Sequence, residues 1–388
     1  MLRERGQGDA EVRPVELFFD LVYVLAVTQL TDHLVTDLSW RGVVETVLLL
    51  LAVWAAWIHT AWITNYFDRD ARPVRLMLIG AMLASLIMSA SLPGAFAGRG
   101  LAFAAALVAI LVGGTGIALA GVGRHHHLGA VFERVLIWWS AIGVLWLAGG
   151  WATGDVRVAV WLAAVVSVYA VLWLGFPVPG LGRSRTTDYT IAGEHMADRC
   201  QLFVILALGE SILVTGAEFG DLSVSAANVT AFVVAFAGSV ALWWIYFDRA
   251  EAAGRRAIAS AGDPGRLALS AYTFAHIPMV AGIIAAAAAD ELAISHPIDP
   301  PTVATAALTI GGPMLYLVGN TVFKWTLWGY VPRSRPVAIA ALVALAPLAL
   351  VASALVHLVA ATLVLVVLAL GDVRAEWGRQ RAERVAAR

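Results

Sequence analysis

Two carboxylic acids, Glu16 and Asp20, lie four residues apart in an otherwise apolar stretch near the start of the chain. Residues at this spacing share one face of a helix, and Pro14 suits the first helical turn. An ionised carboxylate inside a bilayer costs about 2.5–3.5 kcal/mol on insertion scales, so each acid needs a partner there. The pair is therefore a candidate for chemistry, lining the inward mouth of a site.

A third acid, Glu210, follows the sequence E-H-M-A-D-R (194–199) in a later apolar stretch. Arg199 and Glu210 are eleven residues apart, and at 100° per residue this spacing places them on one helix face. Glu210 would lie about 16 Å farther along the axis, near the bilayer centre. Such an acid either pairs with another helix as a structural element or handles a proton or a substrate.

Other polar residues could pair with these acids or bind a substrate. His195 and Arg199 begin the stretch that carries Glu210, while His59, His276 and Asn320 lie within other apolar stretches. His59, Trp62 and Tyr66 follow i, i+3, i+7 spacing, and this stripe either lines a cavity or packs against a neighbouring helix. Asp68 belongs to a set of acids near the inner ends of the predicted spans, mixed with arginines. Two interpretations stay open for that set: structural ion pairs, or an acidic vestibule that faces inward.

Several classes of function lose support from the sequence. The chain has no Walker loop, G-x-S-x-G, H-E-x-x-H or dinucleotide fingerprint, and its single cysteine, Cys200, cannot form an intrachain disulfide. No basic stripe is interleaved with exposed aromatic residues, so nucleic-acid binding is not expected. We expect no cofactor and no dedicated metal site.

The composition predicts an all-α, polytopic membrane protein. Of the 388 residues, 60% are hydrophobic and 14% are charged, whereas soluble domains carry about 25% charged residues. Apolar windows of about 20 residues mark the spans. We split the apolar run 336–370 near Ser353, because about 52 Å of single helix exceeds the bilayer core. The twelve predicted spans are 15–34, 43–65, 74–92, 101–121, 133–152, 157–175, 199–217, 228–247, 268–289, 303–323, 336–352 and 355–371.

The distribution of positive charge supports this count. With both termini cytoplasmic, only Arg41, Arg99 and Arg157 among the lysines and arginines fall outside, as expected when positive residues stay inside. The predicted outer loop 290–302 carries Asp290, Glu291 and Asp299 without a lysine or arginine. The sequence therefore predicts a multi-pass protein of the inner membrane, with membrane lipid as one partner.

The tetrapeptide Y-F-D-R suggests an internal repeat. It ends the second and eighth predicted spans, at 66–69 and 246–249, which correspond if two six-helix halves share one orientation. We therefore predict a parallel 6+6 duplication. The predicted domains are a first half at 1–175, a cytoplasmic linker at 176–198, a second half at 199–371 and a basic cytoplasmic tail at 372–388.

Two motifs give a family resemblance. The sequence R-P-V-E-L-F-F-D-L-V (13–22) with T-Q-L (28–30), together with H-x-x-D-R-x-x-L-F (195–203) and L-G-E-S (208–211), resembles the bacterial low temperature requirement A family. The second motif departs from the family's usual H-x-x-E-R-x-G-L-F by carrying Asp198 and Gln201. The resemblance implies a multispanning inner-membrane protein, and it reinforces Glu16, Asp20, His195, Arg199 and Glu210 as site residues.

Three functional hypotheses follow. The first is a proton-linked secondary transporter or permease for a small solute, in which Glu210 carries the proton and Arg199 tunes it or holds an anion. The second is a membrane-embedded enzyme whose carboxylic acids protonate an isoprenoid or other lipid while aromatic faces stabilise the carbocation. The third is a structural membrane protein of cold adaptation, in which charged residues affect folding alone.

Overall fold

The computed structural model describes residues 2, 12–123, 125–188, 191–221, 225–259 and 261–386. The side chains of residues 221, 248–259, 375–376 and 378–386 lie outside the described part. Within these residues, all the named elements are helices, which confirms the all-α prediction.

The chain folds into two compact units, one of Met1–Leu206 with Ile258–Thr273 and one of Ala207–Ala257 with Phe274–Arg388. The long helix α8 (Gly193–Asp221) contributes residues to both units. The main helices of the first unit are α1 (Pro14–Thr36), α2 (Trp40–Tyr66), α3 (Arg72–Ser91), α4 (Gly100–Val108), α5 (Gly114–Val122), α6 (His127–Trp151), α7 (Gly154–Leu174) and α10 (Pro264–Leu267). Those of the second are α9 (Ala226–Ala259), α11 (His276–Ser295), α12 (Val303–Trp328), α13 (Ser334–Ala344) and α14 (Ala354–Ala386).

The helix lengths confirm a protein with about twelve membrane helices. In the described residues, eleven helices are long and apolar enough to span a membrane, and the apolar helix Ser334–Leu350 is shorter. The run 336–370 is divided as predicted, because α13 and the 3₁₀ helix η5 (Ala346–Leu350) end before α14 begins at Ala354.

Two spans contain a stretch of π-helix. The π-helix η2 (Ala109–Gly113) joins α4 to α5, and η4 (Ala268–Phe274) joins α10 to α11. The second of these spans runs over Pro264–Ser295, six residues beyond the predicted end. Asp290, expected in an outer loop, therefore lies within α11 and is buried.

The predicted duplication and its domain bounds remain a prediction. The second copy of Y-F-D-R includes Asp248 and Arg249, whose side chains lie outside the described residues. In the predicted tail, α14 continues as helix beyond the apolar span that ends at Arg374, while most tail side chains also lie outside the described part.

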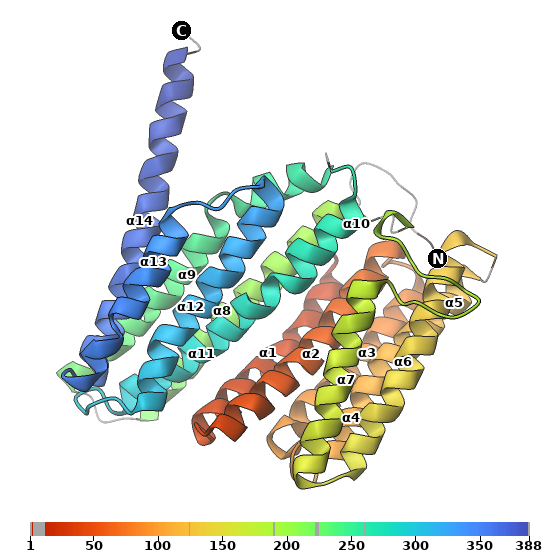
Figure 1. Ribbon diagram of the computed structural model, residues 1–388, viewed down its shortest axis with the longest axis horizontal. Helices are drawn as coiled ribbons and strands as arrows, with labels where there is room; N and C mark the ends of the chain where they lie inside the picture. Colours follow the sequence, from red (N-terminus) through yellow and green to blue (C-terminus); the bar gives the residue numbers. More distant parts are fainter. Residues whose placement is uncertain are drawn as a thin grey trace. The chain divides into compact units, whose positions relative to one another are not determined.

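Helices α1 to α7 of the first unit form a bundle of neighbouring helices (Figure 1), in which α4 and α5 continue each other through η2 as one span. Helix α1 packs against α2 and α3, while α6 packs against α4 and α7. Helix α2 differs from the other helices of the bundle because its side chains are buried on nearly every face. A helix that is apolar and covered on every side is a core helix.

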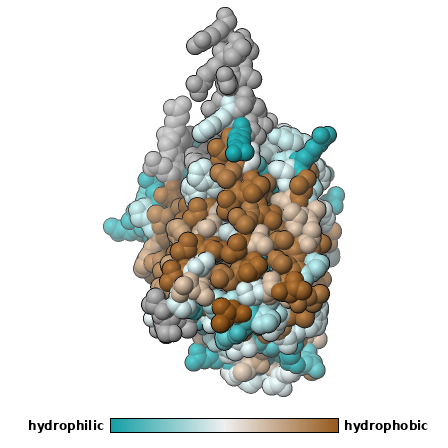
Figure 2. Space-filling model, turned by 90° about the vertical axis from the view of Figure 1, so that its left-hand side faces the viewer, coloured by the Kyte–Doolittle hydropathy of each residue, from teal (hydrophilic) through white to brown (hydrophobic). Residues whose placement is uncertain are grey.

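Apolar side chains also cover the outside of the helices. Leu363, Val367 and Leu370 on α14 are each more than half exposed. Figure 2 shows one such face, where apolar side chains form a broad band between hydrophilic ends. A band of this kind is the surface that contacts lipid chains.

In the second unit, small residues bring α11 and α12 close together. A Cβ atom added at Gly282 would lie 2.5 Å from the backbone nitrogen of Tyr316 and 2.6 Å from the carbonyl oxygen of Gly312. Backbone atoms in a helix cannot move aside, so only glycine fits there. Close approach through small residues is a common means of helix association in membranes.

We expect Gly282→Ala to lower the free energy of unfolding by about 1–3 kcal/mol, the usual cost of overpacking. Thermal unfolding of the purified protein in detergent checks this. Gly311→Ala is the matched control, because a Cβ atom there would meet no atom within 4 Å. Equal midpoints for the two variants would contradict the close contact between α11 and α12.

Candidate functional site

Glu16 and Asp20 lie one turn apart on α1, and both side chains have no exposed surface. Helix α1 begins at Pro14, and the backbone N–H of Arg13 donates to Glu16 Oε2 at 3.1 Å. This bond fixes the first turn in the manner of a capping box. The start of the helix therefore directs the side chains of both acids toward the interior of the first unit.

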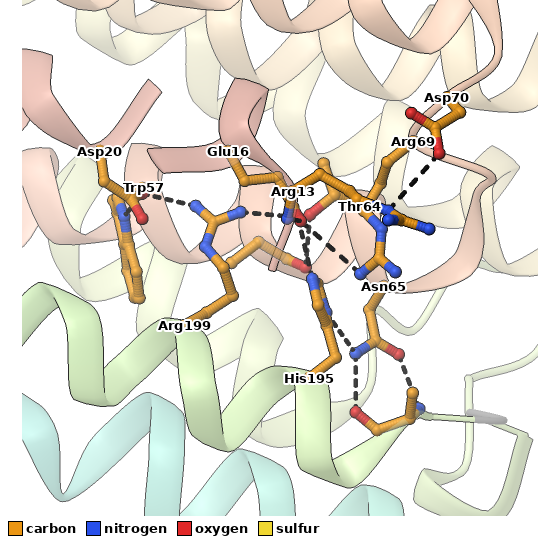
Figure 3. Close-up of polar contacts among 12 residues, drawn as sticks. Arg13, Glu16, Asp20, Trp57, Thr64, Asn65, Arg69, Asp70, His195 and Arg199 are labelled. Carbon is orange, nitrogen blue, oxygen red and sulfur yellow. Dashed lines mark hydrogen bonds and ion pairs between the residues drawn. The ribbon is translucent and has the colours of Figure 1, made fainter. Parts of the chain in front are cut away.

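Arg199 on α8 binds both acids at once (Figure 3). Its Nη1 donates to Glu16 Oε1 at 2.8 Å and its Nη2 to Asp20 Oδ1 at 2.5 Å. The planar guanidinium presents its donors as a fork, which a lysine cannot reproduce. Because the two acids are four residues apart, one fork reaches both.

Aromatic rings enclose this contact. The guanidinium carbon of Arg199 lies 5.8 Å from the ring centroid of Phe19 and 5.7 Å from that of Trp57. The Nε1–H of Trp57 also donates to Asp20 Oδ1 at 2.8 Å. These rings exclude water while their faces attract the cation.

His195, one turn before Arg199, carries its proton on a defined nitrogen. The amide of Asn65 is oriented by Ala192, whose N–H donates to Asn65 Oδ1 at 2.8 Å and whose carbonyl accepts from Nδ2 at 2.9 Å. Nδ2 therefore donates to His195 Nδ1, at 3.1 Å. The proton must then be on Nε2, which donates to Glu16 Oε1 at 2.9 Å.

The second cation of the cluster comes from Arg69, whose Nη1 lies 3.6 Å from Glu16 Oε2. Arg69 is buried, whereas its neighbour Asp68, a predicted site residue, is exposed and accepts a turn hydrogen bond from the N–H of Asp70. At the surface, a hydrogen bond from Arg75, with Arg13 nearby, lowers the pKa of Asp70. We call Glu16, Asp20, His195, Arg199 and Arg69 the ion-pair cluster.

The remaining predicted residues lie elsewhere. His59 is in the first unit, on a different face of α2 from Trp57 and Asn65. Glu210, His276 and Asn320 belong to the second unit. There His276 Nε2 lies 2.8 Å from the hydroxyl of Tyr246. Asn320 Oδ1 accepts from Arg335 Nε at 3.4 Å.

A pocket of about 400 Å³ occupies the other side of α2 in the first unit. Its aromatic wall includes Trp62, Tyr66, Trp139 and Phe176. His59 lies in the same wall, where its Nδ1 accepts from Trp139 Nε1 at 3.3 Å and its Nε2 lies 3.0 Å from Thr115 Oγ1. Both ring nitrogens are therefore used to hold the wall.

The segment from Gly175 to Thr186 forms the rim of this pocket. Gly175 has φ +76°, and a Cβ atom there would lie 2.2 Å from the carbonyl oxygen of Ser184. Arg134 on α6 fastens the rim by donating to Ser184 Oγ at 3.1 Å and to the Leu181 carbonyl at 2.9 Å. Arg183 and Arg185, both exposed, also line the pocket.

This geometry limits the chemistry available. The carboxylates of the ion-pair cluster already accept several hydrogen bonds from cationic and aromatic donors, so they are not free acids or bases. Among the described residues, no group of three or more histidine, cysteine, aspartate or glutamate side chains could hold a metal ion. The pocket, in contrast, is open and has the size of a ligand site.

Sequence reasoning brought together Glu16, Asp20, His195 and Arg199 and placed Arg69 among the arginines near the acids, but it missed Trp57 and Asn65. Of the pocket, it indicated only the stripe of His59, Trp62 and Tyr66, which lies in the pocket wall. The signal for Asn65 was present, since an amide at the apolar end of a span needs partners as an acid does. Nothing in the spacing pointed to the rim, because its residues come from a segment interpreted as a linker.

The helices and the buried cluster define a polytopic helical membrane protein. The chain matches the family described as "Bacterial low temperature requirement A protein (LtrA)" over residues 11–370, and it belongs to that family. It is similar to a protein of Rhizobium meliloti (strain 1021) named "Uncharacterized protein RA0937", with 34% identity over 347 residues, 88% of this chain and 84% of the relative. No solved structure matches the chain.

We expect Arg199→Met to lower the free energy of unfolding by about 3–5 kcal/mol, because it leaves two buried carboxylates without their shared cation. The Asp20→Asn/Arg199→Met double variant should lose less than the sum of the two single losses. Thermal unfolding in detergent measures all three. Arg75→Met, which removes an exposed ion pair, is the control and should change little. Strict additivity would argue against the shared contact.

Proposed function

We propose that this protein is a permease for small organic anions with an apolar body, and that the pocket of the first unit is its substrate site. The observation that carries the proposal is the combination of aromatic walls and two exposed arginines around about 400 Å³ of open space. Ligand sites typically occupy about 300–1,000 Å³ and combine an apolar lining with few polar groups.

The lining is complementary to an anion. Arg183 and Arg185 contribute two positive charges, and no carboxylate is among the described residues that line the pocket. A carboxylate or sulfonate group would meet guanidinium donors at the rim. The apolar body of the ligand would then pack against the rings of Trp62 and Trp139.

The walls are held in place before a ligand arrives. Trp62 Nε1 donates to Thr273 Oγ1 at 3.1 Å, and the rings of Trp139 and Phe176 meet edge to face at 5.4 Å. Arg134 fixes the rim from α6. A preformed site loses less conformational entropy on binding, which favours affinity for a small ligand.

An enzyme acting on lipids is the less favoured candidate. Such chemistry needs a protonated carboxylic acid facing an apolar pocket. Glu16 and Asp20 instead point at Arg199, and the pocket wall offers a histidine whose two nitrogens are engaged. The cluster suits a structural role, in which α1 and the start of α8 hold the cluster side of α2 while its other side forms the pocket wall.

The orientation follows from the predicted topology. Arg183 and Arg185 belong to the segment predicted to be cytoplasmic, so the pocket would open to the inside of the bacterial inner membrane. In this arrangement a solute leaves or enters the pathway from the cytoplasm, and both termini lie on that side.

Binding and transport of 1-naphthalenesulfonate test the proposal, because this anion stays ionised and cannot cross the bilayer as a neutral acid. We expect it to quench tryptophan fluorescence and to enter proteoliposomes faster than empty liposomes. Arg183→Gln and Arg185→Gln should each weaken binding about three- to tenfold through the loss of one cationic contact. Arg333→Gln, an exposed arginine of the second unit, is the control.

The neutral analogue 1-naphthalenemethanol should bind the wild type and both variants alike, since it lacks the charge. Binding without uptake would contradict a permease and leave a receptor or storage function. Absence of both binding and uptake of 1-naphthalenesulfonate would show that the pocket is not a substrate site for such anions.

We further propose that Glu210 couples transport to protons. Its side chain is 4% exposed within the second unit, and buried acids in membrane-spanning helices commonly act as proton relays. Glu210→Gln should keep binding of 1-naphthalenesulfonate but lose the effect of an imposed pH gradient on uptake. Uptake by this variant that still responds to the gradient would rule out Glu210 as the proton carrier.

A further inference from the structure

The second unit contains a small cavity of about 20 Å³ that none of the preceding arguments uses. Four helices meet there: α9, α11, α12 and α14. Its polar lining consists of Ser239, Asp290, Thr309 and Thr362, one side chain from each helix. A space of this size holds a single water molecule or a single small ion.

Asp290 is the feature that requires explanation. Its side chain is 7% exposed, it lines the cavity, and no hydrogen-bond or ion-pair partner is present for it among the described residues. No lysine, arginine or histidine is among the described residues that line the cavity. A buried carboxylate without a counter-charge is strongly unfavourable in a membrane. The group is stable there as the neutral acid or beside a cation bound in the cavity.

The neighbouring groups supply neutral oxygen atoms. Thr309 Oγ1 donates its proton to the carbonyl of Thr305 at 2.9 Å, so its lone pairs remain for a ligand. Pro313, which also lines the cavity, lies inside α12 and has no N–H, so the Thr309 carbonyl lacks its usual helical bond.

Hydroxyl groups complete the lining from the other two helices. A Cβ atom at Gly238 would lie 3.4 Å from Thr362 Oγ1, so the missing side chain leaves room for this hydroxyl beside α9. Ser239 Oγ lies 3.3 Å from Ser211 Oγ, which gives Ser239 a place to direct its proton away from the cavity. Its lone pairs are then available to a cation.

We propose that Asp290, Ser239, Thr309 and Thr362 form a binding site for one sodium ion. One carboxylate with neutral hydroxyl and carbonyl oxygens gives a net charge of −1, which a monovalent cation balances. All the donors are hard oxygen atoms, as such a cation prefers. Mg²⁺ fits less well, because it keeps several water molecules that a cavity for one molecule cannot hold. The sodium site does not depend on the anion pocket, so a result against one proposal does not count against the other.

Equilibrium binding of ²²Na⁺ to the full-length protein in detergent tests the site, at constant ionic strength set with choline chloride. We expect about one sodium ion per chain and, at ten times the dissociation constant, a rise of about 3 °C in the unfolding midpoint. Asp290→Asn should abolish both effects. Asp299→Asn, an exposed aspartate in the following loop, should leave both unchanged.

A second variant covers the case in which Asp290→Asn fails to fold. Thr362→Val keeps the shape and charge but removes one oxygen ligand, and should weaken sodium binding about tenfold. Wild-type sodium affinity in either folded variant would overturn the assignment. A midpoint that depends on pH through Asp290 but not on sodium would also overturn it, and would make the group a proton site.

Discussion

The guanidinium of Arg199 holds two carboxylates away from water where α1 packs on the first turns of α8, and the first unit depends on this contact. Its two arms reach Glu16 and Asp20 at 2.8 Å and 2.5 Å, which requires the acids to be one helical turn apart and the helices to keep one register. Sliding either helix would separate the charges in a medium that cannot solvate them. The contact therefore specifies alignment as well as contributing energy.

Much of the cluster could be predicted from the sequence, because a bilayer penalises unpaired charge. That rule pointed to Glu16, Asp20 and Arg199 without any knowledge of helix packing, and the family resemblance added His195. Arg69 was not distinguished from Asp68, since their positions differ by one residue at the end of a helix. Which of the two turns inward depends on where α2 stops, at Tyr66, and no spacing rule fixes that end.

The number of membrane spans could be predicted from the sequence, whereas the lengths of the individual spans were harder to predict. The break before Ala354 followed from bilayer thickness alone. The end of α11 did not, because Asp290 and Glu291 had the composition of an outer loop while the helix continues to Ser295. Only one wall of the aromatic pocket was indicated, by the spacing of His59, Trp62 and Tyr66 on α2. The rest of the lining comes from α6, α7, the rim and η4, whose proximity is a property of tertiary packing.

Asn65 shows how an uncharged residue controls electroneutrality. The two carboxylates of the cluster are balanced by the guanidiniums of Arg69 and Arg199 only while the imidazole of His195 adds no charge. The Asn65 amide, locked by the peptide group of Ala192, can only donate to Nδ1, and so it keeps a second proton off the ring. The electrical balance of a site inside the membrane is thus set by a hydrogen bond to the main chain.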